Sequence, residues 1–333
     1  MNPHVAVVVL NWNGWQDTLP CLDSLAHQAY QNTSIIVVDN ASTDGSRDRI
    51  AAWPDNGGKH WVRRQFVGDA NTPMADQVDT LGHGDFVYLQ SDINGGFAAG
   101  NNLGIRLALA CRSVYVWILN NDTEVHHRAL DALVNCAEKD NSIGMCGSLL
   151  VYHDARDQLQ ACGGVIFDYW RAMGKQLGHG LNPKSNEINA ILGAPLSYIA
   201  GASLLARSEM ILEVGAFEEK YFLYFEEIDW AERARNWKMA VAADSVVYHK
   251  EGASIGTASR GRRSVMSQYY LNRNVILFYA RFHQLLLPMA ILRVIRELLH
   301  QIKKRDGPMC AATWLALSHG ITQRSGKVEL KIS

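Results

Sequence analysis

The sequence predicts an α/β fold built around a mostly parallel sheet. Short apolar runs rich in β-branched residues alternate with segments of helical spacing, and each apolar run ends in a polar turn. This alternation is typical of parallel sheets with helices on their faces. The 333 residues suffice for one large α/β domain with appendages or for two modest domains, and the 48% hydrophobic content allows a sizeable core.

The predicted elements follow one another in a regular order. The expected strands are Val5–Leu10, Ser34–Asp39, Phe86–Gln90, Tyr115–Leu119, Tyr198–Ala206 and Ser245–Tyr248. The expected helices are Trp15–Ala29, Ala98–Cys111, Arg128–Glu138, Ser208–Val214, Glu226–Trp237 and Phe278–Ile302. The polar, aperiodic stretch Pro54–Gly84 predicts a long surface excursion outside the sheet. Because ligands bind at the carboxyl ends of strands in such sheets, the polar residues that follow each strand are the functional candidates.

The C-terminal part of the chain is strongly basic. From residue 260 to the end there are 13 Lys/Arg against 3 Asp/Glu, which gives a net charge of +10. Because the whole chain has a net charge of −1, the residues before 260 carry −11. Such a tail fits an anionic partner, either a membrane surface or a nucleic acid. Its basic residues alternate with Leu and Ile more than with stacking aromatics, which favours the membrane over nucleic acid.

The helical stretch Phe278–Ile302 differs from a transmembrane span. Its longest apolar run, Leu285–Leu292, contains Pro288 and is far shorter than the roughly 20 residues that a spanning helix needs. An interfacial amphipathic helix fits better, with arginines at headgroup level and a further basic cluster at residues 303–305. The alternative is a pair of helices packed on the domain with a solvated basic face.

The cysteines and the N-terminus indicate a cytoplasmic protein. The six cysteines lie far apart, without a C-x-x-C pair or zinc spacing, and are expected to be reduced thiols. They are Cys21, Cys111, Cys136, Cys146, Cys162 and Cys310. The first apolar run, Val5–Leu10, is too short for a secretory signal and ends in polar residues.

Two strand ends carry candidate metal ligands. Asn120-Asn121-Asp122 directly follows a predicted strand, where the Asp122 carboxylate could hold Mg²⁺ or Mn²⁺ against a diphosphate. A polar turn that merely ends the strand is the alternative. His249 follows another strand, and a neutral imidazole is a reasonable further ligand, although a histidine at a strand end is often structural.

Polar residues after the first two strands form a candidate nucleoside pocket. Trp12 could stack on a base, while Asn11, Asn13 and Asp39 could bond its edge and the ribose; each is also an ordinary turn or cap residue. The segment 94–104, NGGFAAGNNLG, combines small residues with a helix N-terminus that favours negative charge. It lacks G-x-G-x-x-G, which argues against a dinucleotide fold.

Three carboxylates follow an aromatic run at residues 221–230. A carboxylate among aromatics can have a raised pKa and act as a general base, a role that we predict for Glu227. Glu226 precedes it in the predicted helix. Asp229 is either part of the catalytic acid pair or a plain i,i+4 ion pair with Arg233.

Taken in order, these segments resemble the family 2 glycosyltransferases of the GT-A fold, in particular a bacterial rhamnosyltransferase-like branch. The resemblance covers roughly residues 4–280. It rests on "VVVLNWNG", "IIVVDNASTDGS", "NGGFAAGNNLG", "WILNNDTEV", "GASLLARSEMILEVGAFEEKYFLYFEEIDWAERAR" and "VVYHKEGASIG". It implies a GT-A domain over residues 1–260, with a nucleotide-binding half to about 122 and an acceptor half from 123. Residues 261–333 would then form a basic, membrane-associating helical region.

The resemblance also implies roles for single positions. The nucleotide would be held by Asn11, Trp12, Asn13, Asp39, Asn101 and Asn102, with Asn120 and Asn121 touching sugar or phosphate. Asp122 and His249 would bind the divalent ion, Mg²⁺ or Mn²⁺, although asparagine at 120 replaces the first carboxylate of the family's motif. Glu227 and Asp229 would be the catalytic acids, with Glu227 as base where the family usually has aspartate.

The predicted function is an inverting sugar transfer in bacterial surface polysaccharide synthesis. The resemblance suggests rhamnose from dTDP-rhamnose as donor and a glycan or lipid-linked acceptor, at the inner face of the cell membrane. A nucleotidyltransferase is one alternative, although "NWNGWQDT" lacks the Gly-rich, Arg- or Lys-bearing loop expected after its first strand. A non-catalytic nucleotide- or glycan-binding protein of the same fold is the other.

Overall fold

The computed structural model describes residues 2–56, 62–67, 81–250 and 263–330. Their main sheet has the strand order β3-β4-β2-β1-β5-β12-β7-β13-β6, with β8 paired to β7. The strands are β1 Val5–Asn11, β2 Thr33–Asp39, β3 Val62–Val67, β4 Asp85–Gln90, β5 Tyr115–Asn120, β6 Thr123–Val125, β7 Ile143–Tyr152, β8 Ala155–Cys162, β12 Ser203–Arg207 and β13 Lys238–His249. All neighbouring pairs among β3, β4, β2, β1 and β5 are parallel. This arrangement confirms the predicted α/β class.

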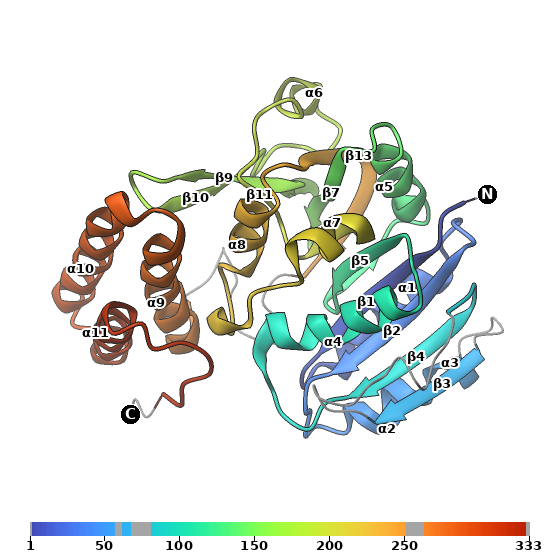
Figure 1. The fold of residues 1–333 in the computed structure, drawn as a ribbon, viewed down its shortest axis with the longest axis horizontal. Coiled ribbons are helices and arrows are strands. Elements are labelled where there is room, and N and C mark those ends of the chain that lie inside the picture. The colour runs from blue at the N-terminus through green and yellow to red at the C-terminus, as the bar shows by residue number, and fades with distance from the viewer. Residues whose placement is uncertain (1, 57–61, 68–80, 251–262, 331–333) are drawn as a thin grey trace.

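Helices cover both faces of the sheet (Figure 1). Alternate residues of β1 point to opposite layers, so Val7 packs with α1 and α5 whereas Val8 packs with α4 and α7. This double burial explains the unbroken apolar run of β1, since neither face meets water. The helices are α1 Trp15–Ala26, α2 Ser46–Ala51, α3 Trp53–Asn56, α4 Gly96–Ala110, α5 Ala129–Ala137, α6 Glu187–Ile191, α7 Ser208–Val214 and α8 Glu226–Arg233.

A small second sheet and three C-terminal helices lie beside this core. The sheet consists of β9 Gly164–Asp168, β10 Met173–Gln176 and β11 Tyr198–Ile199. Helices α9 Val265–Phe282, α10 Leu287–Lys303 and α11 Gly307–Ile321 pack together, with α10 at the outer edge of the molecule (Figure 1). Within the described ranges, every helix is too short or too polar to span a bilayer.

Three predicted elements need correction. The excursion Pro54–Gly84 contains a strand, β3, which extends the parallel sheet at its edge; its two arginines and glutamine hid it from a search for apolar runs. The predicted strand Tyr198–Ala206 is divided between two sheets by a turn at residues 201–202. The predicted helix Phe278–Ile302 is two helices, because the chain turns at residues 283–286 and Pro288 lies in the first turn of α10.

Candidate active site

The first two strands of the chain end in a closed polar network. Asn11 and Asp39 lie opposite each other in the parallel register of β1 and β2. Asn11 Nδ2 donates to Asp39 Oδ2 at 2.9 Å, and the Ser42 N–H and Gln90 Nε2 donate to Asp39 Oδ1 at 2.8 and 3.1 Å. Asp39 is fully buried, so these donors replace the water that its charge would otherwise bind.

The turn after β1 is tied to the turn after β2. The Asn13 N–H donates to Ser42 Oγ at 2.8 Å, and Asn13 Oδ1 accepts from the Thr43 N–H at 2.7 Å. Asn13 has a φ of +50°, a conformation that asparagine tolerates better than most residues. Trp12 is half-buried and lines a small cavity of about 140 Å³ together with Phe222.

The asparagines after β5 point to different neighbours. Asn121 Nδ2 donates to Thr18 Oγ1 at 3.0 Å and to Asn11 Oδ1 at 3.4 Å, so this amide joins β5 to the start of α1. Asn120 Nδ2 lies 3.4 Å from His249 Nε2. The first contact braces the sheet edge, whereas the second places Asn120 beside the predicted metal ligands.

The structure brings Asp122 and His249 together. Strand β13 pairs antiparallel with β6, which puts His249 opposite Thr123, the residue after Asp122. His249 Nε2 lies 3.1 Å from Asp122 Oδ1, and both side chains are 8% exposed. On the other side of the ring, His249 Nδ1 lies 2.7 Å from Gln160 Oε1.

This donor set suits a divalent ion. When His249 is neutral with its proton on Nδ1, Gln160 Oε1 accepts that proton and the lone pair of Nε2 faces Asp122. In that state a cation shared between the two acceptor atoms removes their repulsion. One carboxylate and one imidazole, completed by diphosphate oxygens and water, suffice for Mg²⁺ or Mn²⁺. Within the described residues, no third His, Cys, Asp or Glu completes a metal cluster.

The loop before α8 has an unusual backbone conformation. Phe222, Tyr224 and Phe225 have φ angles of +67°, +66° and +76°, which residues other than glycine rarely adopt. The Phe97 N–H donates to Phe222 O at 2.8 Å. A Cβ on Gly96 would lie 2.1 Å from the same carbonyl oxygen. Glycine at 96 is therefore required by the close approach of this loop.

Helix α9 holds this loop from the other side. Asn274 Nδ2 lies 3.0, 2.7 and 3.0 Å from the carbonyl oxygens of Tyr221, Leu223 and Tyr224. Arg273 Nη2 donates to Tyr221 O at 2.7 Å. Both side chains are fully buried, so these bonds replace the water that the loop carbonyls have lost. The C-terminal region thus completes the site rather than forming a separate appendage.

The first two residues of α8 carry carboxyl groups, of which Glu226 is buried and Glu227 is half-buried. Burial and the neighbouring charge of Glu227 raise the pKa of Glu226, whose Oε2 is buried without a hydrogen-bond partner among the described residues. Burial also raises the pKa of Glu227, partly offset by the N–H groups of Glu227 and Gly201. A helix N-terminus stabilises an anion by only about 0.3–1 kcal/mol, whereas desolvation can shift a pKa by several units. Desolvation therefore dominates here.

A turn between the two sheets connects Glu227 to the predicted metal ligands. A Cβ on Gly201 would lie 2.3 Å from Glu227 Oε1, so a side chain at 201 would displace this carboxylate. The next residue, Ala202, accepts a hydrogen bond from the Asn120 N–H at 3.1 Å. Two consecutive residues thus link the candidate base to the end of β5, two positions before Asp122.

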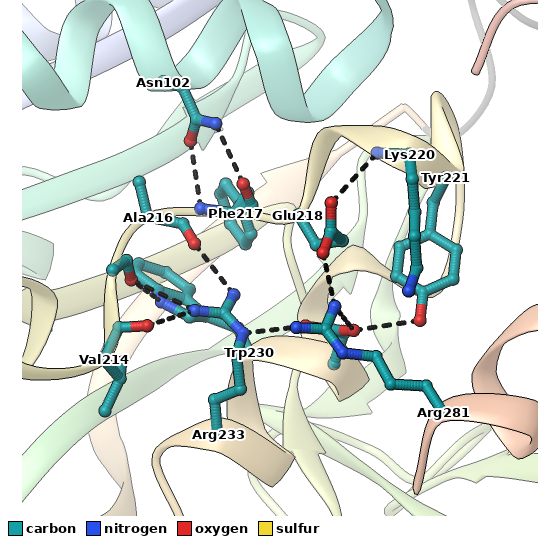
Figure 2. A network of polar contacts seen from close by, with 12 residues as sticks. Asn102, Val214, Ala216, Phe217, Glu218, Lys220, Tyr221, Trp230, Arg233 and Arg281 are labelled. Atoms are coloured by element: carbon teal, nitrogen blue, oxygen red, sulfur yellow. Dashed lines mark hydrogen bonds and ion pairs between the residues drawn. The ribbon is translucent and has the colours of Figure 1, made fainter. Parts of the chain in front are cut away.

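Asp229 lies in a separate buried network, which favours the ion-pair alternative over a catalytic role. Tyr221 Oη and Arg281 Nη1 donate to Asp229 Oδ2 at 2.9 and 2.8 Å, and Arg233 Nε donates to Oδ1 at 2.8 Å. Figure 2 shows Arg233 and Arg281 approaching this network from two sides. The carboxylate has no exposed surface. Its hydrogen bonds to Tyr221, Arg233 and Arg281 tie the start of α8 to the neighbouring loop and to α9.

Asn101 and Asn102 are also engaged within the protein. Asn102 exchanges hydrogen bonds of 2.9 and 3.0 Å with the Phe217 backbone (Figure 2). Its Nδ2 also donates to Glu219 Oε1 at 2.8 Å. Asn101 is fully buried and donates to Phe97 O at 2.9 Å. These bonds brace α4 against its neighbours, and the nucleotide-binding role of the two asparagines stays a prediction.

Several residues of the site were missed by sequence reasoning. They are Gln160, Gly201, Arg273 and Asn274. For the last two there was a signal, since a buried helix rarely carries Arg-Asn unless both are bonded. Gln160 and Gly201 carry no local signal, because each acts on a residue from a distant strand or helix.

Comparisons with known sequences agree on one family. A family model described as glycosyl transferase family 2 matches residues 6–66. A low-salt glycan biosynthesis hexosyltransferase of Haloferax volcanii is 24% identical over 185 residues, which are 55% of this chain and 57% of that protein. The chain thus spans just over half the length of this relative. An N-acetylglucosaminyl-diphospho-decaprenol L-rhamnosyltransferase of Mycobacterium tuberculosis is 22% identical over 251 residues, 71% of this chain and 72% of that protein.

Solved structures with the same fold include nucleotide-sugar enzymes. A mannosyltransferase of Pyrobaculum calidifontis in complex with GDP-Man and Mn²⁺ has a TM-score of 0.55 and 14% identity, over 97% of this chain and 88% of that one. GalNAc-T7 with UDP, GalNAc and Mn²⁺ also has a TM-score of 0.55, at 13% identity over 84% and 49% of the two chains. At these identities the two structures establish the fold alone.

The sheet, its flanking helices and the polar edge at the carboxyl ends of its strands define a GT-A glycosyltransferase fold. Within that class, residues 6–66 match the model of glycosyl transferase family 2, and the relatives named above are a hexosyltransferase and a rhamnosyltransferase.

Proposed function

We propose that this protein transfers a sugar from a nucleoside diphosphate sugar to a hydroxyl group of an acceptor. The observation that carries the proposal is the position of Glu227. Its carboxylate lies against Gly201, at a turn bonded to the strand end that carries Asp122. A half-buried carboxyl group with a raised pKa is thus linked through two consecutive residues to the strand end that carries the proposed divalent-ion ligands, an arrangement that suits such a transfer.

The residues have distinct roles in the proposed reaction. Glu227 accepts the proton of the acceptor hydroxyl, whose oxygen attacks the anomeric carbon from the side opposite the leaving nucleoside diphosphate, with inversion. The network of Asn11 and Asp39 holds the nucleoside end, and Asn120 contacts sugar or phosphate. Asp122 and His249 would hold the divalent ion, which supplies positive charge to the leaving diphosphate when bound.

The donor and the site of action are finer parts of the proposal. The rhamnosyltransferase relative supports dTDP-rhamnose as the first donor to test, for glycan synthesis at the inner face of the cell membrane. Helix α10 supports contact with an anionic membrane surface, because its exposed apolar side chains recur at spacings of three or four residues. They are Met289, Leu292, Ile295, Leu299 and Ile302. Basic residues at 296 and 303–305 complement lipid phosphates beside this apolar face.

A donor panel tests the function directly. The full chain is incubated with Mg²⁺ or Mn²⁺ and each of several nucleoside diphosphate sugars, and release of nucleoside diphosphate is measured with and without lipid-linked glycans. We expect release with one donor, and loss of release in Asp122→Ala or in excess chelator. Binding without turnover for every donor would favour a binding protein. Release of diphosphate from a nucleoside triphosphate would favour a nucleotidyltransferase.

A further inference from the structure

A mostly apolar groove of about 770 Å³ runs between the β9–β10 hairpin and helices α9 and α10, and we call it the hairpin groove. Ile166 and Met173 of the hairpin line it and are 38% and 57% exposed, so its apolar wall continues to the surface. Two arginines, Arg263 and Arg293, also line it. Lys175 of the hairpin is a third cation in the lining. An apolar groove with such cations suits a molecule that is itself part apolar and part anionic.

Arg293 lacks a full set of partners in this position. Its Nη1 atom is buried and has no hydrogen-bond partner among the described residues. Burial and the charge of Arg263 lower the pKa of Arg293, which means that the two cations repel each other in poorly solvated surroundings. The carboxylate of the nearby Glu297 already has other partners. Its Oε1 accepts hydrogen bonds from Gln268 Nε2 at 2.8 Å and from Gln301 Nε2 at 2.7 Å. An anion between the arginines would relieve this repulsion.

The hairpin groove also adjoins the candidate base. Phe225, which lines the groove, directly precedes the acid pair at the start of α8. Tyr198 lines it too, and the charges of Glu227 and Glu226 add to burial in raising the pKa of its phenol, so these groups lie near one another. A molecule held in the groove therefore has a short path to Glu227.

We propose that the hairpin groove binds the acceptor, with Arg263 and Arg293 holding a phosphate or diphosphate that joins an apolar chain to the accepting sugar. The apolar chain lies along the hairpin and α10, and the sugar points toward Glu227. This inference rests on the proposed function for the identity of the site as an acceptor site. It adds an anion-binding site distinct from the divalent-ion site proposed at Asp122 and His249.

The test uses farnesyl diphosphate as a soluble amphiphilic probe, titrated into the full chain by calorimetry beside farnesol and inorganic diphosphate. We expect farnesyl diphosphate to bind at least 10-fold more tightly than either fragment. Arg293→Met should weaken its binding at least 10-fold without lowering the melting temperature, because the variant removes a buried, incompletely bonded cation. Arg263→Met, at an exposed position, should weaken binding while leaving the fold intact.

Arg296→Met is the matched control, since Arg296 is exposed on the same helix and does not line the groove. Equal losses in Arg293→Met, Arg263→Met and Arg296→Met would overturn the proposal in favour of general attraction to anionic surfaces. Equal binding of inorganic and farnesyl diphosphate would also overturn it. Absence of nucleoside diphosphate release from the wild type with every donor and acceptor tested would refute the proposed function, whereas the probe titration tests the groove separately.

Discussion

The carboxylates at the two ends of the site are both buried, yet their surroundings differ. Asp39 receives hydrogen bonds from Asn11, Ser42 and Gln90. Glu226 has a buried oxygen without a partner among the described residues, and burial raises the pKa of Glu226 and Glu227. A satisfied carboxylate remains an anion and positions its neighbours, whereas a poorly solvated one retains affinity for a proton. The first suits binding and the second suits proton transfer.

The two regions are also built differently. The Asp39 network joins residues at the ends of adjacent parallel strands, so strand register alone brings them together. The loop that carries the glutamates is held from outside, by Gly96 and Phe97 on one side and Asn274 on the other. Its three residues with positive φ need such support, because each costs about 1–3 kcal/mol on its own.

The Glu227→Gln variant is expected to have the largest effect, and it tests whether this carboxylate is the base. The variant keeps the shape of the side chain but cannot accept a proton, so we expect kcat to fall roughly 10²- to 10⁴-fold while donor affinity stays unchanged. Because burial raises the pKa of Glu227, wild-type kcat should rise with pH through a limb above the usual carboxyl range, and this limb should vanish in the variant. Initial rates across pH, with calorimetry for the donor, measure both. Undiminished turnover would remove Glu227 from the role of base.

The support of the strained loop is tested by Asn274→Ala. Loss of the amide leaves buried carbonyl oxygens without their donor, so the free energy of unfolding should fall by about 3 kcal/mol in urea titrations. We expect kcat to fall about 10-fold or more, since the glutamates lose their fixed position. Asn272→Ala is the control, because that amide bonds only within α9, to Gln268 O. Equal effects of the two variants would mean that α9 does not position the loop.

The binding end is tested by Asp39→Asn. The variant removes the charged acceptor of the hydrogen bonds from Asn11, Ser42 and Gln90. A hydrogen bond to a charged group contributes about 1.5–3 kcal/mol, so we expect nucleotide affinity to fall roughly 10- to 100-fold. The kcat at saturating donor should change less than the affinity. Asp44→Asn serves as control, since Asp44 is exposed and bonds only its near neighbour Ser46. An unchanged nucleotide affinity in calorimetry would exclude Asp39 from nucleotide binding.

The smallest effect is expected on stability, from Glu226→Gln. The pKa of Glu226 is raised in the folded protein, so its contribution to stability is present below the ordinary value of 4.5 and is lost as pH rises through the folded pKa. Glutamine does not ionise, so the variant does not lose this stability as pH rises. The variant should therefore melt higher than the wild type at pH 8 and equally near pH 4. A lower melting temperature of the variant at pH 8 would show that the charged form is stabilised.

Local patterns predicted much of the sheet but little of its second half. Apolar runs between polar turns predicted β1, β2, β4 and β5 within one or two residues, because a strand buried on both faces must be apolar throughout. The polar edge strand β3 escaped this criterion, and residues 251–256 of the last motif lie outside the described residues. The division of the chain at residue 260 stays a prediction.

The sequence by itself determined the fold class, the strand ends that carry Asp39 and Asp122, and the acids that begin α8. Only the tertiary structure decided which of those acids are poorly solvated. Asp229 received two arginines, one of them from α9, whereas Glu227 received the backbone of Gly201. Local pattern reflects the burial and periodicity of neighbouring residues, whereas the solvation of a charge depends on groups brought to it by long-range packing. The role of each carboxylate was therefore fixed by partners up to 52 positions away in the chain.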